Sequence, residues 1–154
     1  MKKLVVSFAV LCMLFSFSTS SFAKHGENVL REGEFLWRNE YLKSSNGRYL
    51  LMFVVENVEL YDTVERKTLW VGRTGSLHQG LEISPDGKVS SRWGSLYIWQ
   101  SDNQAYANIH YQGNPPANLK GDQLIVQDDG NLVLYNTKDP NKGWYPVWAT
   151  DTYK

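Results

Sequence analysis

A motif of nine residues that occurs three times constrains the fold of this 154-residue chain more than any other feature. Residues 53–61, 84–92 and 127–135 align without gaps, and each is followed by a strand-like segment ending in Trp70, Trp99 or Trp148. The repeats are unequally spaced, which indicates loop insertions at 102–118 and 137–145. Repeats this short cannot bury an apolar face alone. We therefore expect three small antiparallel sheets around a pseudo-threefold axis, with the three tryptophans in a shared core.

The local pattern favours strands throughout. Short runs rich in valine, isoleucine, leucine, tyrosine and tryptophan are separated by turn residues, and Asn46-Gly47, Asp86-Gly87 and Asp129-Gly130 are typical hairpin turns. The expected strands are residues 49–55, 58–62, 81–84, 96–99, 124–127 and 132–135. This pattern predicts a single all-β domain.

Residues 1–23 have the features of a secretory signal peptide. Lys2 and Lys3 precede a largely apolar stretch at 4–17, and Ser21-Phe22-Ala23 forms a small-residue cleavage site. The stretch is too short for a membrane-spanning helix, and Cys12 lies mid-run after bulky Leu11, which disfavours a lipid anchor. We expect a mature domain at 24–154 that is secreted or extracellular, in the periplasm or on the cell surface, without membrane insertion.

Composition excludes several other functions. The 16 basic and 16 acidic residues balance, so the chain lacks the basic footprint of a nucleic-acid-binding protein. Its 1 cysteine lies in the predicted signal peptide, so disulfides and cysteine-based zinc sites are not expected. His25, His78 and His110 have no metal-ligand spacing, so no metal or cofactor is expected.

The sequence also disfavours an enzyme. Asp128 and Asp129 are neighbours, so on a strand they point to opposite faces and cannot flank one glycosidic bond. The chain has no nucleophile elbow and no phosphate-binding glycine loop.

The third repeat is the one that carries recognisable chemistry. Gln127, Asp129, Asn131, Val133 and Tyr135 alternate with other residues, so a strand–turn–strand segment presents them on one face. Amides and a phenol both donate and accept hydrogen bonds, and the carboxylate accepts them. Such a row suits the adjacent hydroxyls of a neutral polyol, with the valine against ring carbons. The plainer interpretation is a hairpin with a polar outer face.

With these five residues the sequence resembles the bulb-type (monocot, snowdrop-type) mannose-binding lectins, whose signature is Q-x-D-x-N-x-V-x-Y. Leu36, the segment from Tyr41 to Leu51 and the tryptophan-ended repeats extend the resemblance over most of residues 28–152. It implies a β-prism II fold of three four-stranded antiparallel sheets, and sugar binding without calcium. It also implies that Asp129 and Asn131 bind the axial 2-hydroxyl of mannose, Gln127 the 3-hydroxyl and Tyr135 the 4-hydroxyl. The disulfide of the plant members is missing, which fits a secreted bacterial member.

The other two repeats depart from the signature. The first keeps only Asn57 and Tyr61, a degenerate counterpart that we expect to serve turn and packing roles. The second keeps only Asp86 and places Arg92 at the tyrosine position. We therefore expect one working site, with exposed Trp144 as a wall beside the sugar.

The leading functional hypothesis is a secreted lectin for α-mannose or mannose-containing glycans. One site per chain would call for an oligomer such as a homodimer, because linked sites gain avidity. The alternatives are a lectin-like bacteriocin that docks on mannose-containing polymers of related bacteria, and a fold-only member that acts through protein contacts.

Overall fold

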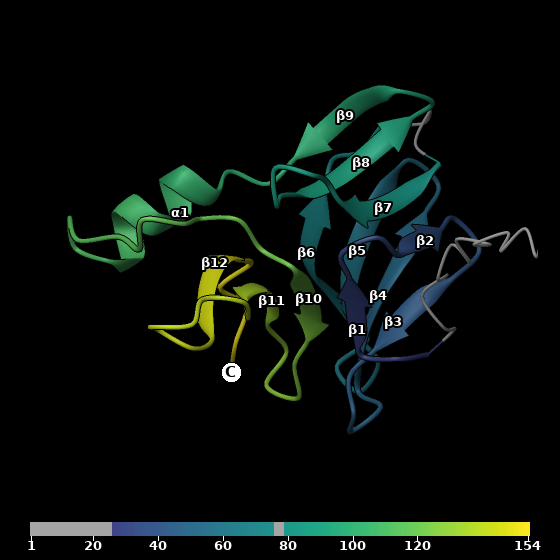
Figure 1. Cartoon of the computed structure of the whole chain (residues 1–154). Helices are drawn as coiled ribbons and strands as arrows, with labels where there is room; N and C mark the ends of the chain where they lie inside the picture. The colour runs from purple at the N-terminus through teal and green to yellow at the C-terminus, as the bar shows by residue number, and fades with distance from the viewer. Residues whose placement is uncertain (1–25, 76–78) are drawn as a thin grey trace, which may run out of the picture.

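The computed structural model describes residues 26–75 and 79–154, which form three four-stranded sheets and one helix (Figure 1). The predicted signal peptide at 1–23, His25 and His78 lie outside the described residues. Within the described ranges, no helix has the length and apolar character needed to cross a membrane.

All strand pairs are antiparallel, and each sheet has its sequence-earliest strand at one edge. The first sheet has the order β1 (Val29–Arg31), β10 (Gln123–Val126), β11 (Leu132–Asn136) and β12 (Tyr145–Ala149). The second has the order β2 (Phe35–Trp37), β7 (Gly80–Ile83), β8 (Val89–Trp93) and β9 (Leu96–Gln100). The third has the order β3 (Tyr41–Lys43), β4 (Tyr49–Val54), β5 (Asn57–Asp62) and β6 (Lys67–Gly72). The predicted all-β architecture of three four-stranded sheets is confirmed.

Strand register matches the three repeats where each motif pairs with its tryptophan-bearing strand, whereas the β4–β5 hairpin of the first repeat is offset by one residue from the other two. Trp70 pairs with Leu60, Trp99 with Ser91 and Trp148 with Leu134, and these three partners occupy the same place in the aligned motifs. A register shift follows each partner residue, so all three sheets carry an irregularity at the same position. Because such bulges bend a strand and increase its twist, the shared irregularity helps each sheet to turn toward the common axis.

The three tryptophans meet in the core, as predicted. Their ring centroids are 5.7 Å apart for Trp70–Trp99 and for Trp70–Trp148, and 6.0 Å apart for Trp99–Trp148, all edge-to-face. Each sheet adds fully buried leucines to the same cluster. These are Leu30, Leu36, Leu42, Leu51, Leu60, Leu81, Leu124, Leu132 and Leu134. Without a disulfide between sheets, this aromatic and aliphatic core holds the prism together.

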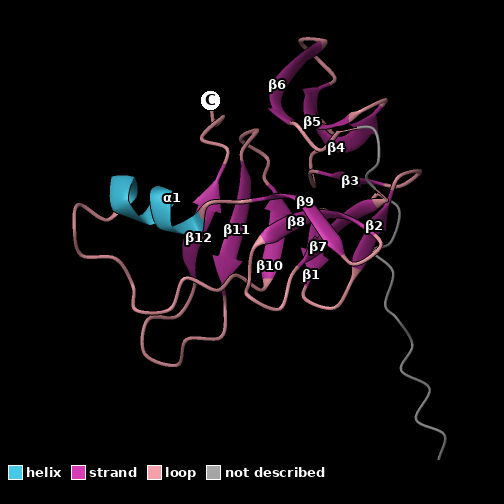
Figure 2. Ribbon diagram, turned by 90° about the horizontal axis from the view of Figure 1, so that it is seen from above, coloured by secondary structure: helices cyan, strands magenta, loops and turns pink. Residues whose placement is uncertain are grey.

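The first insertion contains the helix α1 (Asn103–His110), which the sequence analysis did not predict. Asp102 caps it, because the Asp102 carboxylate accepts a 2.8 Å hydrogen bond from the Ala105 N–H. The helix packs against β12 through a face that includes the buried Ala107, and both views show it beside that strand (Figure 1, Figure 2). The insertion therefore adds a helix next to the sheet that carries the intact motif.

Candidate functional site

The intact motif begins directly after β10 and comprises a five-residue turn and most of β11. The turn at 127–131 is closed by the Gln127 N–H, which donates to the Asn131 carbonyl at 2.9 Å, and by the Gly130 N–H, which donates to the Gln127 carbonyl at 3.2 Å. Gly130 has a φ of 88°, and a Cβ there would lie 2.8 Å from a ring carbon of Tyr49. Glycine is therefore required both for the turn and for the close packing of the turn on the neighbouring sheet.

Successive side chains of β11 point to opposite sides of the sheet, so they face the core and the site in turn. Leu132 and Leu134 are buried in the core, so Val133 and Tyr135 face the opposite side of the sheet. Val133 is nevertheless only 3% exposed, between its strand partners Ile125 and Ala149. It therefore forms the floor of the site and offers a ligand little surface.

Gln127 and Tyr135 meet across the face. The Gln127 Nε2 donates a 2.8 Å hydrogen bond to the Tyr135 phenol oxygen, although the two residues are eight positions apart. The ring of exposed Trp144 lies beside this pair, with its centroid 6.0 Å from that of Tyr135. The indole is exposed, as expected, and lies beside the phenol end of the motif, while its role as a wall beside a sugar stays a prediction.

Asp129 and Asn131 form the other half of the site. The Asp129 Oδ1 accepts a 2.9 Å hydrogen bond from the Asn131 N–H, which holds the exposed carboxylate on the turn. The Asn131 Oδ1 accepts hydrogen bonds from the Thr150 hydroxyl at 3.0 Å and from the Thr152 N–H at 3.3 Å. Among the described residues, the Asp129 Oδ2 and the Asn131 Nδ2 have no hydrogen-bond partner. The same turn therefore leaves an acceptor on the exposed Asp129 and a donor on Asn131, which is 7% exposed, without partners in the described part of the chain.

The threonines and helix α1 are parts of the site region that the sequence analysis missed. Burial raises the pKa of Tyr106 to about 12, and the nearby charges of Asp151 and the phenols of Tyr111, Tyr135 and Tyr153 act in the same direction. Helix α1 reaches the site region through His110, whose Nε2 lies 3.2 Å from the Asp151 Oδ2. Asp102 is a typical N-cap residue, so the sequence does contain a signal for the start of the helix. Nothing in the sequence, however, indicates that this segment lies near the motif.

In the first repeat, the turn itself is different. Val54 pairs with Asn57, so only two residues connect β4 and β5, and Val55 takes a φ of 47°. Asn57 and Tyr61 lie within β5, and Glu59 between them accepts a 2.7 Å hydrogen bond from the Thr68 hydroxyl. The five-residue turn that carries Asp129 in the third repeat has no counterpart here.

The second repeat keeps the five-residue turn, but the Asp86 carboxylate on that turn already has partners within the chain. The Asp86 Oδ1 accepts a 2.5 Å hydrogen bond from the Ser84 hydroxyl, and its Oδ2 lies 3.3 Å from the Lys88 Nζ. These contacts, the hydroxyl first, lower the pKa of Asp86. Arg92, at the tyrosine position, lies 3.3 Å from Glu82 and over the ring of Phe35. The polar groups at this position are therefore already engaged with one another.

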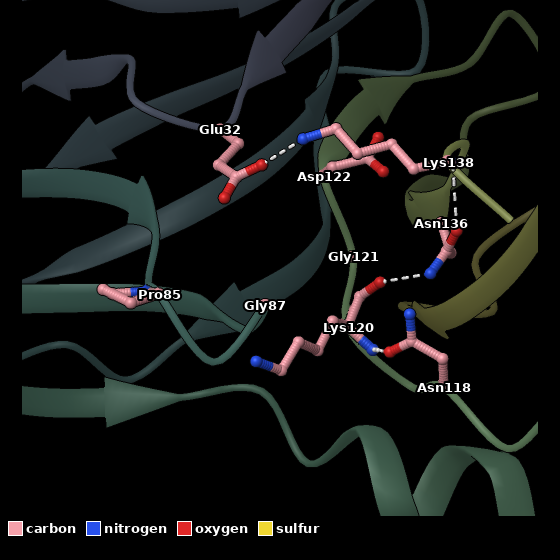
Figure 3. Close-up of a pocket in the computed structure, with 9 residues that line it drawn as sticks. All are labelled: Glu32, Pro85, Gly87, Asn118, Lys120, Gly121, Asp122, Asn136 and Lys138. Atoms are coloured by element: carbon pink, nitrogen blue, oxygen red, sulfur yellow. Dashed lines mark hydrogen bonds and ion pairs between the residues drawn. The ribbon is translucent and has the colours of Figure 1, made fainter.

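A cleft that contains no residue of the intact motif lies where the 84–88 turn meets residues 118–122 and 136–138 (Figure 3). It has a volume of about 220 Å³, and its polar groups bind one another. The Asn136 Nδ2 donates to the Lys120 carbonyl at 2.9 Å, and Lys138 pairs with Glu32. The described residues contain no cluster of three side chains able to hold a metal ion. The polar groups of this cleft therefore hold two sheets together, and we do not take the cleft as the functional site.

Solved structures of lectins resemble this chain. The Japanese Marasmius oreades lectin superposes with a TM-score of 0.60 at 22% identity, over 85% of this chain and 94% of that one. A monomeric monocot mannose-binding lectin from Gastrodia elata gives 0.59 at 27% identity, over 82% and 97%. The mannose-specific bulb lectin of Scilla campanulata (bluebell) gives 0.51 at 24% identity, over 83% and 100%. Comparisons with models of known protein families and with curated protein sequences find no match.

The Gastrodia elata neighbour is a monocot mannose-binding lectin and the Scilla campanulata neighbour is a mannose-specific bulb lectin. The fold of this chain is a β-prism II, as the sequence analysis predicted. Lectins are carbohydrate-binding proteins and not enzymes, which agrees with the prediction of a non-enzymatic protein.

Proposed function

We propose that this protein is a lectin that binds α-mannose or mannose-containing glycans at one site, formed by Gln127, Asp129, Asn131, Val133 and Tyr135. The observation that carries the proposal is the pair of available groups on the turn. The Oδ1 atoms of Asp129 and Asn131 are held within the chain, which leaves one carboxylate acceptor and one amide donor for a ligand.

An acceptor and a donor from two residues of the same turn match a single hydroxyl group. The hydroxyl donates its proton to the Asp129 Oδ2 and accepts a hydrogen bond from the Asn131 Nδ2. The charged acceptor makes the first bond the stronger one. We assign this pair to the axial 2-hydroxyl of mannose, which is the group that distinguishes mannose from glucose.

The other end of the site contributes Gln127 and Tyr135. Because the phenol oxygen already accepts from Gln127, its own hydrogen is available to a second hydroxyl of the sugar. The Gln127 Oε1 supplies a further acceptor, and Trp144 offers an aromatic face at the edge. The groups available are hydrogen-bonding and aromatic, as a neutral sugar requires.

Calorimetric titration with methyl α-D-mannoside and methyl α-D-glucoside tests this function. We expect one mannoside per chain, weaker or no binding of glucoside, and at least about a tenfold loss of affinity in Asp129→Ala and Asn131→Ala. The matched controls are Asp86→Ala and Asn57→Ala, which change the same residue types at the equivalent positions of the other repeats. Binding that does not distinguish the two sugars, or that the control variants weaken equally, would contradict the proposal.

We further infer that the protein acts outside the cell as a homodimer. The features of residues 1–23 support secretion, and a single small site per chain supports an assembly that gains avidity. Sequencing the N-terminus of the exported protein should find Lys24 first, and sedimentation should give twice the mass of the mature chain. An exported protein that still begins at Met1 would contradict the inferred removal of a signal peptide. A monomeric mass would contradict the homodimer.

A further inference from the structure

Residues 150–154, which follow β12, cross the turn of the proposed glycan site and contact its backbone. The Thr152 hydroxyl donates a 2.7 Å hydrogen bond to the Gly130 carbonyl, and the Lys154 N–H donates a 3.1 Å bond to the Asp129 carbonyl. We call residues 150–154 the strap. Because the strap binds two carbonyls of a five-residue turn, it restricts the movement of that turn.

The strap also determines which way the amide of Asn131 faces. Its Oδ1 accepts from the Thr150 hydroxyl and from the Thr152 N–H, and a backbone N–H can only donate. The oxygen must therefore face the strap, and the Nδ2 must face the other way. Thr150 is itself held in place, because its hydroxyl oxygen accepts a 3.1 Å bond from the Leu132 N–H.

The side chains of Lys154 and Asp151 attach the strap to the rest of the protein. The Lys154 Nζ lies 3.0 Å from the Oδ2 of Asp62, a buried carboxylate of the third sheet, and also pairs with Glu65. The Asp151 Oδ2 lies 3.2 Å from the His110 Nε2 at the end of α1. The strap is thus held both by a neighbouring sheet and by the inserted helix.

From these contacts we infer that Thr150 and Thr152 are positioning residues of the glycan site. They fix the Asn131 amide so that its Nδ2 points toward the hydroxyl that Asp129 also binds. This inference rests on the proposed lectin function. Neither threonine touches the ligand. Each threonine holds the Asn131 side chain in one orientation before the ligand binds, so binding no longer has to order that side chain. Ordering one side chain on binding lowers the affinity about two- to tenfold.

The direct variant is Thr150→Val, which keeps the shape of the side chain and removes the hydroxyl. We expect the affinity for methyl α-D-mannoside to fall about two- to tenfold, and Thr150→Ser to restore it. The matched control is Thr63→Val, which removes a hydroxyl bonded to the Arg48 carbonyl at 2.7 Å in the third sheet. That control should lower the Tm without changing affinity. If Thr150→Val does not fold, Thr150→Ala takes its place, because it also removes the hydroxyl that donates to the Asn131 Oδ1 and leaves room for water at the Leu132 N–H.

A second measurement separates this inference from the proposed function. In the sugar-free protein, the side-chain amide of Asn131 should give two sharp, well-dispersed NMR signals with restricted motion, and Thr150→Val should increase that motion. Unchanged amide motion together with unchanged affinity in the folded variant would overturn the positioning role. If wild type shows no mannoside binding, the lectin proposal fails, and the effect of Thr150→Val on the Asn131 amide still decides whether the strap positions that residue.

Discussion

The side-chain amide of Gln127 donates a 2.8 Å hydrogen bond to the phenol oxygen of Tyr135, and so joins the two ends of the intact motif. The bond orients both groups before any ligand binds. Gln127 lies on the turn after β10 and Tyr135 lies near the end of β11, so the bond can form only when the hairpin is in register. It therefore links correct pairing of the strands to the arrangement of the proposed sugar-binding groups.

Tyr135→Phe should weaken mannoside binding about tenfold while the fold is retained. The variant removes one ligand hydrogen bond and the acceptor that orients Gln127, and a net loss near 1.4 kcal/mol corresponds to that factor. Calorimetry measures the change, with Tyr61→Phe in the first repeat as the matched control. An equal loss in both variants would show that the effect does not come from this site.

Trp144→Ala should also weaken binding. The side chain is 60% exposed, so its removal costs little stability, but its ring stands 6.0 Å from that of Tyr135 at the edge of the site. We expect mannoside to change the tryptophan fluorescence of wild type and not of this variant. Trp93→Ala, which removes another exposed indole on the second sheet, serves as the control. A mannoside-induced fluorescence change that survives in Trp144→Ala would exclude Trp144 as a wall of the site.

Much of the fold could be predicted from the sequence, because the repeats place the same residue types at the same structural positions. The alignment that puts Leu60, Ser91 and Leu134 in register predicts the tryptophan cluster that the structure contains. The three-residue strands β1 and β2 give too little periodicity to be recognised alone. Helix α1 buries only Asn103 and Ala107, so its apolar stripe is too weak to predict a helix.

The residues of the candidate site could be proposed from the sequence, but their arrangement in space could not. The period of two in the third repeat places Gln127 and Tyr135 on one face, as found. The roles of Thr150 and Thr152 depend on the path of the chain after β12, which no local pattern specifies. The burial of Val133 depends on residues distant in sequence, so its small exposure could not be predicted either.

Ser91→Ala should raise the free energy of unfolding by about 1 kcal/mol, because it removes a buried hydroxyl that has no partner. Ser91 is 0% exposed, and its Oγ has no hydrogen-bond partner among the described residues. Leu60→Ala at the equivalent position should instead cost about 2–5 kcal/mol by leaving a cavity. Urea denaturation measures both. A destabilised Ser91→Ala would show that the hydroxyl makes a stabilising contact after all.

Acid should destabilise the protein through the carboxylates that bind Arg48 and Lys154. Hydrogen bonds from Arg48, at 3.0 and 2.8 Å, hold the pKa of Asp62 well below its usual 3.8. A hydrogen bond from Lys154, and then one from Lys67, lower the pKa of Glu65 from 4.5 to about 2. Because both values are depressed in the folded state, their stabilisation is complete above about pH 4.5 and declines as the pH falls toward 2.

Thermal unfolding between pH 7 and pH 2.5 checks this prediction. Asp62→Asn should lower the Tm at pH 7, because Arg48 loses a buried partner, and should reduce the acid dependence of the Tm. An acid dependence as steep in the variant as in wild type would show that other groups are responsible.

The central claim is that one repeat of three binds mannose, and mapping the chemical shifts of backbone amides during a titration with methyl α-D-mannoside tests it most directly. The three repeats provide internal controls within a single sample. We predict changes centred on residues 127–135, the strap and Trp144, with residues 53–61 and 84–92 unaffected. Changes centred on either of those other repeats, or the absence of any saturable change, would contradict the account.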